Sequence, residues 1–197
     1  TLLTDFGTVD PFIGQMKGVI AMRCPQANVV DLTHAIEPQN VMQAGYVLAD
    51  SWRFFPPGTI HVAVVDPGVG SARRIIAARV DDQIMIAPDN GLLTAVFTDT
   101  PPREVRVLEN PDLFLKSVSN TFHGRDKFAP AAGLLAGGLK FEEAGATIDD
   151  RQTLNLPQPV VNDDGSVQGE VILIDRFGNA ITNIPGPQLP MMPVFEI

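Results

Sequence analysis

Short apolar runs rich in β-branched residues alternate along this chain with segments that repeat apolar residues at helical spacing. Phe12–Cys24 and Val41–Phe54 have the helical spacing, whereas Asn28–Leu32 and Thr59–Val65 have the pattern of buried strands. Such alternation is typical of an α/β domain in which helices cover a largely parallel sheet. We therefore expect a layered α/β fold with functional side chains in the loops that follow the strands.

The rest of the first 150 residues continues this pattern and adds one hairpin. Ile75–Val80 and Gln83–Ala87 flank a two-residue turn and predict an antiparallel pair. The other expected elements are a strand at Thr1–Phe6, a helix at Leu92–Phe97, a strand at Glu104–Leu108 and a helix at Asp126–Leu135.

The character of the chain changes after Leu154–Pro159, which contains two prolines and predicts a linker. Only strand-like segments follow, at Val167–Ile174 and Ala180–Ile184. We expect residues 1–157 to form the α/β domain. Residues 158–197 then form the beginning of a β-rich, barrel-like domain that is truncated in this sequence.

Composition narrows the possible partners. The net charge is −9. An acidic protein gains no binding free energy by releasing the counterions of a nucleic-acid backbone, so a nucleic-acid partner is not expected. No apolar run is long enough to span a membrane, and no signal segment is visible at the start. Cys24 is the only cysteine, which favours a reducing cytoplasm. Because the chain begins with Thr1 inside an expected strand, removal of a targeting segment stays open.

Four short motifs carry the candidate chemistry, and three of them follow apolar β-branched runs. They are Leu3–Gly7, Val65–Gly70, Thr121–Asp126 and Ile174–Asn179. The glycine-rich turn after Asp66 lacks the Lys-Ser/Thr ending and the spacing of phosphate-binding loops, so we reject a phosphate site there. Each motif taken alone has a structural alternative: Asp5 could simply cap its own turn, His123 could be a structural residue of its loop, and Arg176–Asn179 is good turn chemistry.

In this order the four motifs resemble the S-adenosyl-L-methionine (SAM) hydroxide adenosyltransferases, which are related to the SAM-dependent fluorinases and chlorinases. The resemblance implies an α/β domain followed by a β-barrel-like domain. It also implies a homotrimer in which each site is shared between the first domain of one subunit and the second domain of its neighbour. The implied reaction is hydrolysis of SAM to adenosine and L-methionine.

The resemblance also implies roles for individual residues. Asp5 binds the ribose hydroxyls, and Asp66, Arg73 and His123 form the catalytic set that activates water, with Asp66 also meeting the substrate. We take Arg73 rather than Arg74 as the match, since neighbours on a strand face opposite ways. The methionine and adenosyl groups are met by Asp175, Phe177 and Asn179.

The chemistry of a sulfonium explains these residue types. Methionine leaves as a neutral molecule, so no acid is needed, and the barrier lies in orienting and desolvating water at the 5′ carbon. We therefore expect neither a metal nor an organic cofactor. The halogenating relatives carry an aromatic residue at the position of Asp66 and a serine at that of Gly124. A carboxylate repels a halide and Gly124 has no hydroxyl, so hydroxide is favoured here.

Two other function classes stay open from the residues alone. The chain could be a non-catalytic module that binds adenosine or SAM. A metal-dependent hydrolase is the third possibility, because His34 and His61 could join Asp66 and His123. No two of these residues have close ligand spacing, however, so the sequence does not favour a metal site.

Overall fold

The computed structural model describes residues 1–186 and divides the chain into two compact units, Thr1–Leu154 and Asn155–Ile197. The first unit is built on a six-stranded sheet with the order β2-β1-β3-β5-β4-β6. Strands β2, β1, β3 and β5 run parallel, while β4 is antiparallel to both β5 and β6. The strands are β1 (Leu2–Thr4), β2 (Asp31–Thr33), β3 (Ile60–Val64), β4 (Ile75–Val80), β5 (Gln83–Pro88) and β6 (Glu104–Val107).

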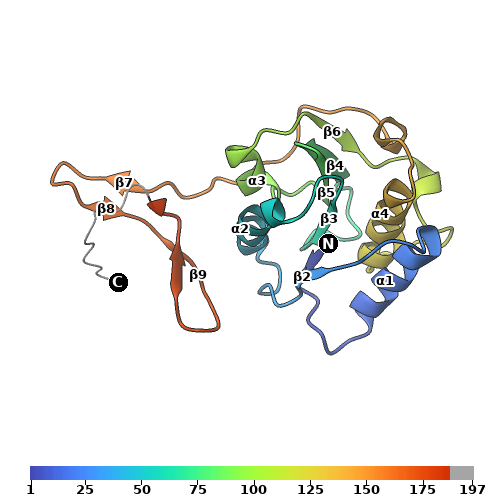
Figure 1. Cartoon of the computed structure of the whole chain (residues 1–197), viewed down its shortest axis with the longest axis horizontal. Helices are drawn as coiled ribbons and strands as arrows, with labels where there is room; N and C mark the ends of the chain where they lie inside the picture. The colour runs from blue at the N-terminus through green and yellow to red at the C-terminus, as the bar shows by residue number, and fades with distance from the viewer. Residues whose placement is uncertain (187–197) are drawn as a thin grey trace. The chain divides into compact units, whose positions relative to one another are not determined.

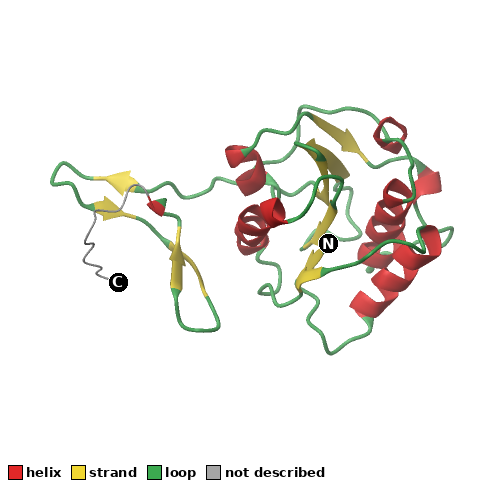
Figure 2. Ribbon diagram, in the orientation of Figure 1, coloured by secondary structure: helices red, strands yellow, loops and turns green. Residues whose placement is uncertain are grey.

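Helices cover both faces of this sheet, as expected for a layered α/β domain (Figure 1). Helices α1 (Phe12–Arg23) and α4 (Ala129–Ala136) pack together on one face. Helices α2 (Val41–Ser51) and α3 (Thr94–Asp99) lie on the other. Figure 2 shows the strands between the two helical layers. Shorter turns are η1 (Trp52–Phe54), η2 (Pro111–Leu113), the π turn η3 (Gly124–Phe128) and η4 (Phe141–Ala144).

The alternation of side chains along β3 creates two separate cores. Val62 and Val64 belong to the apolar cluster under α1 and α4, whereas Ala63 and Val65 belong to the cluster under α2 and α3. A strand buried on both faces offers no solvent-exposed position, which explains why residues 62–65 are all apolar. The sheet therefore holds the loops after its strands on a rigid support.

The expected α/β class is correct, but several boundaries differ. The run at Asn28–Leu32 is not a buried strand: only Asp31–Thr33 forms β2, which is partly exposed because it lies at the edge of the sheet. The helix expected from Asp126 begins as the π turn η3, and α4 starts at Ala129 with Pro130 in its first turn.

The second unit contains strands and turns in the part that is described. β7 (Val160–Val161) pairs with β8 (Val167–Gln168), and β9 (Val171–Ile174) pairs with β10 (Ala180–Thr182), both antiparallel. The single strand expected over Val167–Ile174 is therefore two strands. The expected barrel-like domain extends through residues 187–197, which lie outside the described residues, and the barrel stays a prediction.

None of the helices within residues 1–186 combines the length and apolar character that crossing a membrane requires.

Candidate functional site

The carboxyl ends of β1 and β3 meet at a cavity of about 250 Å³. Asp5 directly follows β1, and Asp66 lies just beyond β3, so the parallel pairing brings both carboxylates to the same edge of the sheet. His123 and Gly124 reach the same cavity from the segment before α4. The cavity thus joins residues from three of the four sequence motifs.

Asp5 is held by the segment that precedes α2. The backbone N–H of Gln39 donates to Oδ2 of Asp5 at 2.8 Å. Gln39 has a φ of 66°, a left-handed conformation that is uncommon for a residue other than glycine. Asn40 caps α2 by accepting from the backbone N–H of Gln43 at 2.9 Å. One carboxylate oxygen of Asp5 is therefore oriented by the start of a helix, and the group keeps further acceptor positions.

Asp66, Arg73 and His123 form one hydrogen-bonded set. Nε of Arg73 donates to Oδ1 and Oδ2 of Asp66 at 2.8 and 2.9 Å, and Nη2 of Arg73 also donates to Oδ2 of Asp66. The same Nη2 lies 2.9 Å from Nδ1 of His123. The side chains of Asp66 and Arg73 are only 5% and 10% exposed, which strengthens the attraction between them.

The contact with Arg73 determines how the proton sits on a neutral His123. An arginine can only donate, so Nδ1 of His123 must accept, and Nε2 carries the hydrogen. Burial, followed by the positive charges of Lys127 and Arg73, lowers the pKa of His123 below its usual value. At neutral pH this ring is therefore an uncharged hydrogen-bond donor through Nε2.

The glycine-rich turn after β3 sets the distance between Asp66 and the loop that leads to His123. Gly70 has a φ of 80°, and a Cβ there would lie 2.5 Å from the carbonyl oxygen of Asn120. Only glycine fits both the backbone conformation and this close approach. The turn is closed further by the N–H of Val69, which donates to the carbonyl of Asp66 at 3.1 Å.

The two neighbouring arginines go to different partners. Arg73 binds Asp66, while Arg74 binds Asp89 and Asp150 through contacts of 2.6 and 2.8 Å. Arg74 is therefore more than a surface charge, because the Asp89 side chain that it neutralises is only 2% exposed.

Asp175, Phe177 and Asn179 lie together in the turn between β9 and β10 of the second unit. Oδ1 of Asp175 accepts from the backbone N–H groups of Phe177 and Asn179, each at 2.8 Å. The side-chain amide of Asn179 donates to Oδ2 at 2.7 Å and, with these bonds, lowers the pKa of Asp175. Phe177 is 89% exposed. These contacts make the motif a well-formed turn.

Two features of the cavity could not be predicted from the sequence. Gln39 is one, because nothing in a single sequence marks its left-handed backbone. The other is a cluster of aromatic rings beside the cavity, in which Phe6, Phe12 and Phe122 meet edge to face with centroids 5.1–6.2 Å apart. Phe12 and Phe122 come from segments more than 100 residues apart, so only the fold joins them.

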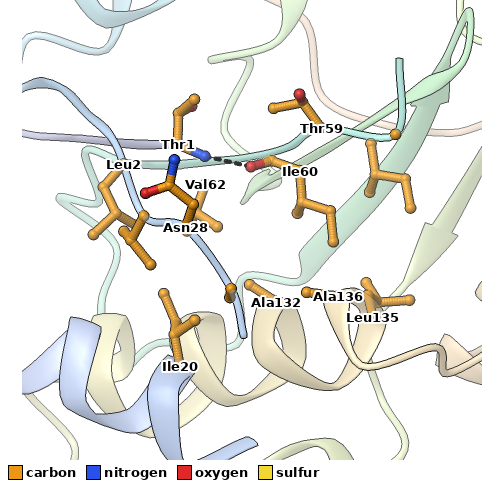
Figure 3. Close-up of a pocket in the computed structure, with 14 residues that line it drawn as sticks. Thr1, Leu2, Ile20, Asn28, Thr59, Ile60, Val62, Ala132, Leu135 and Ala136 are labelled. Carbon is orange, nitrogen blue, oxygen red and sulfur yellow. Dashed lines mark hydrogen bonds between the residues drawn. The ribbon is translucent and has the colours of Figure 1, made fainter. Parts of the chain in front are cut away.

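A second cavity of about 320 Å³ lies at the opposite, amino-terminal ends of the strands. Figure 3 shows it between the backbone at Thr1 and Ile60 and the side chains of Ile20, Ala132 and Leu135. Its lining combines apolar side chains with polar groups and includes none of the predicted site residues.

The histidines that suggested a metal site have other partners. Nδ1 of His34 lies 2.9 Å from the hydroxyl of Thr4, and Nε2 of His61 lies 2.5 Å from Oε1 of Gln83. In the described part of the chain, no three His, Cys, Asp or Glu side chains come together as a group that could hold a metal ion.

Comparison with known proteins connects this arrangement to a family. A sequence profile of the SAM hydroxide adenosyltransferase N-terminal domain matches residues 1–145. The chain is 42% identical to an (R)-S-adenosyl-L-methionine hydrolase of Thermus thermophilus, over 92% of this chain and 72% of that protein. It is 30% identical to a fluorinase of Actinopolyspora mzabensis, over 92% of this chain and 70% of the fluorinase.

A solved structure shows the same fold. The crystal structure of an uncharacterized conserved protein from Thermotoga maritima superposes with a TM-score of 0.91 at 43% identity, covering 95% of this chain and 72% of that one. With the profile match over most of its length and relatives at about 40% identity, this chain belongs to the SAM hydroxide adenosyltransferase family.

Proposed function

We propose that this protein hydrolyses SAM to adenosine and L-methionine. Water attacks the 5′ carbon of the adenosyl group, a carbon–oxygen bond forms, the carbon–sulfur bond breaks, and one proton is released. The observation that carries this proposal is the hydrogen-bonded set of Asp66, Arg73 and His123 at the cavity that Asp5 also lines. The hydrolase relatives at 35–42% identity support the same reaction.

Asp5 is proposed to bind the ribose. Its Oδ2 accepts one hydrogen bond from Gln39, and a carboxylate offers about four acceptor positions. The remaining positions can accept both hydroxyls of a ribose diol, an arrangement that is stronger with a charged acceptor than with a neutral one.

The contacts suggest separate roles for Asp66 and His123. Neutral His123 has its hydrogen on Nε2, so it can donate to the attacking water but cannot take a proton there. Arg73 makes three contacts with Asp66 and leaves the carboxylate about one further acceptor position, so we propose that Asp66 orients the water and receives the proton. Arg73 holds both groups in place through its hydrogen bonds.

The cavity favours water over a halide. A negative Asp66 beside the attack line raises the energy of a second anion, whereas water gains an acceptor. Gly124 provides no hydroxyl, and a Cβ there would lie 3.1–3.2 Å from Phe6, Met16 and Phe122. We therefore propose hydroxide transfer for this chain in spite of its fluorinase relatives.

The remaining parts of the proposal concern the second unit and the assembly. We propose that Asp175 binds the ammonium of the methionine moiety, that Asn179 adds a donor and an acceptor, and that Phe177 packs on the adenosyl group. Support comes from the family resemblance and from the exposure of Phe177. A homotrimer with sites shared between subunits rests on the same resemblance. Cytoplasmic location is proposed because the single cysteine, Cys24, is buried and free.

No cofactor is part of the proposed reaction, because the sulfonium already provides a good leaving group. The test is chromatography of SAM incubated with the protein, in chloride and chloride-free buffers and with a chelator. We expect adenosine and methionine at equal rates in all three conditions. A chlorinated nucleoside would favour a halogenase, loss of activity with chelator a metal enzyme, and intact SAM a binding module.

A further inference from the structure

The segment that brings Phe122 and His123 to the cavity is hydrogen-bonded to Asp126, a residue without a role in the proposed reaction. Asp126 is fully buried, with 0% of its surface exposed, and it lies in the π turn η3 that begins at Gly124. Single π turns inside helices are often found at functional sites. A buried charge needs compensating hydrogen bonds, so the partners of Asp126 show what it holds in place.

The carboxylate of Asp126 has two partners. Oδ2 accepts from the backbone N–H of Ser119 at 2.7 Å, and Nε of Arg125 donates to Oδ1 at 2.7 Å. Burial acts to raise the pKa of Asp126, but the hydrogen bonds from Arg125 and Ser119 outweigh it and leave the pKa below its usual value. The group therefore stays ionised in the folded protein at neutral pH.

The backbone of Asp126 holds the same loop a second time. Its N–H donates to the carbonyl of Phe122 at 3.1 Å, and its carbonyl accepts from the N–H of Leu115 at 2.9 Å. Within the loop, the N–H of Phe122 donates to Oγ of Ser119 at 3.0 Å. Arg125, fixed by the carboxylate, lies 5.0 Å from the centre of the Phe122 ring. Residues 115–122 are thus attached to Asp126 at their start, middle and end.

We propose that Asp126 is a positioning residue, which fixes the loop of residues 115–122 and thereby the placement of Phe122 and of His123 against Arg73. Asp126 does not line the cavity, whereas Phe122, His123 and Gly124 do. The inference rests on the proposed function, because its effect on turnover requires that His123 take part in SAM hydrolysis. Displacement of a reacting group by about 1 Å can cost on the order of 100-fold in rate.

The chain offers a closely matched control. Asp89 is also buried, is paired with Arg74, and accepts from the backbone N–H of Gln152 at 2.8 Å. It does not line the cavity and does not contact the loop of residues 115–122. Asp126→Asn and Asp89→Asn therefore make the same chemical change in the same kind of site, and only the first acts on the loop.

The experiment compares steady-state hydrolysis of SAM and the ring ¹⁵N spectrum of His123 in the full chain. For Asp126→Asn we expect kcat to fall by about tenfold or more with KM changed less than about threefold. The spectrum should change from one tautomer, protonated at Nε2, to a mixture as His123 leaves Arg73. Asp89→Asn should keep the wild-type kcat and spectrum, whatever its thermal stability.

Ser119→Ala is the second variant, for the case that Asp126→Asn does not fold. It removes the Ser119 hydroxyl, which accepts from Phe122 and also hydrogen-bonds to Asp126, but it keeps the carboxylate and its backbone contact. We therefore expect a smaller fall in kcat and the same direction of spectral change. Wild-type kcat and spectrum in both loop variants, or equal losses in Asp126→Asn and Asp89→Asn, would overturn the proposal. If the wild type does not hydrolyse SAM, the proposed function fails, and the His123 spectrum alone decides whether Asp126 positions the ring.

Discussion

At the scale of residues, one arginine, Arg73, holds two of the side chains that line the cavity, Asp66 and His123. Arg73 neutralises Asp66 and at the same time fixes the tautomer of His123, so its position decides which group donates and which accepts. Its guanidinium also lies 5.6 Å from the centre of the buried Phe128 ring, which restricts its movement. A lysine could not replace it, since the pairing with Asp66 uses the two-pronged geometry of the guanidinium.

Asp66→Asn should reduce turnover much more than it weakens binding of adenosine. The substitution removes the negative acceptor for the attacking water but leaves Asp5, which we propose holds the ribose. Groups that orient water or accept its proton typically contribute about 10²–10⁴-fold. Turnover by chromatography and adenosine affinity by calorimetry check this, with Asp89→Asn as the control. An unchanged kcat would remove Asp66 from the mechanism.

Gly124→Ala should destabilise the protein by about 1–3 kcal/mol, a typical cost of overpacking. Its Cβ would come within 3.1–3.2 Å of Phe6, Met16 and Phe122, which is tighter than ordinary contacts. Gly124→Ser makes the same contacts and adds a hydroxyl. Equal losses of unfolding free energy in the two variants are expected in denaturant titrations; a clearly more stable serine variant would mean that its hydroxyl finds a partner in the cavity.

At the scale of elements, β3 consists of four apolar residues and one buried histidine. His61, its second residue, is fully buried, and its Nε2 faces Oε1 of Gln83. The amide nitrogen of Gln83 donates to the carbonyl of Phe55, so its oxygen is the atom left to accept from His61. Burial lowers the pKa of His61 to about 4. The strand is thus built around a neutral histidine.

Stability should therefore fall as the pH decreases from about 6.5 to about 4. In this window the unfolded chain binds a proton at His61 before the folded protein does, which favours unfolding by on the order of 3 kcal/mol in total. His61→Gln replaces the ring N–H donor by an amide N–H donor that cannot titrate. The unfolding free energy of this variant should therefore depend less on pH than that of the wild type. Identical pH slopes for wild type and variant would show that His61 is not held neutral. The lowered pKa of His123 acts in the same direction and remains in both proteins.

At the scale of the whole molecule, the two units contribute differently. The first unit contains the apolar cores together with Asp5 and Asp66, and the second contains the other proposed substrate contacts. Both apolar clusters lie entirely within residues 1–154. The second unit, in contrast, contains Asp175, Phe177 and Asn179. Apolar side chains are exposed there, and Ile174, for example, is 69% exposed. The first unit thus has its own core, and the second contributes candidate binding residues.

A fragment of residues 1–154 should fold with nearly the thermal midpoint of the first unit in the full chain, because no residue of either core is removed. The same fragment should bind SAM more weakly, since the proposed contacts of Asp175, Phe177 and Asn179 are lost. Scanning calorimetry and equilibrium binding are the two measurements. A fragment that binds SAM as well as the full chain would contradict the role of the turn between β9 and β10.

The sequence by itself determined the α/β class, the hairpin of β4 and β5, and the strand-end motifs, because periodicity and turn chemistry are local properties. It could not place β2 at the edge, separate β8 from β9, or reveal the left-handed Gln39 and the burial of Asp126. It also did not predict that Arg74 pairs with Asp89 and Asp150. Those features depend on contacts such as that between Arg73 and His123, which are 50 residues apart. Only the packed sheet decides which distant groups meet. Burial there lowers the pKa of His61 and of His123, and the contact with Arg73 fixes the tautomer of His123.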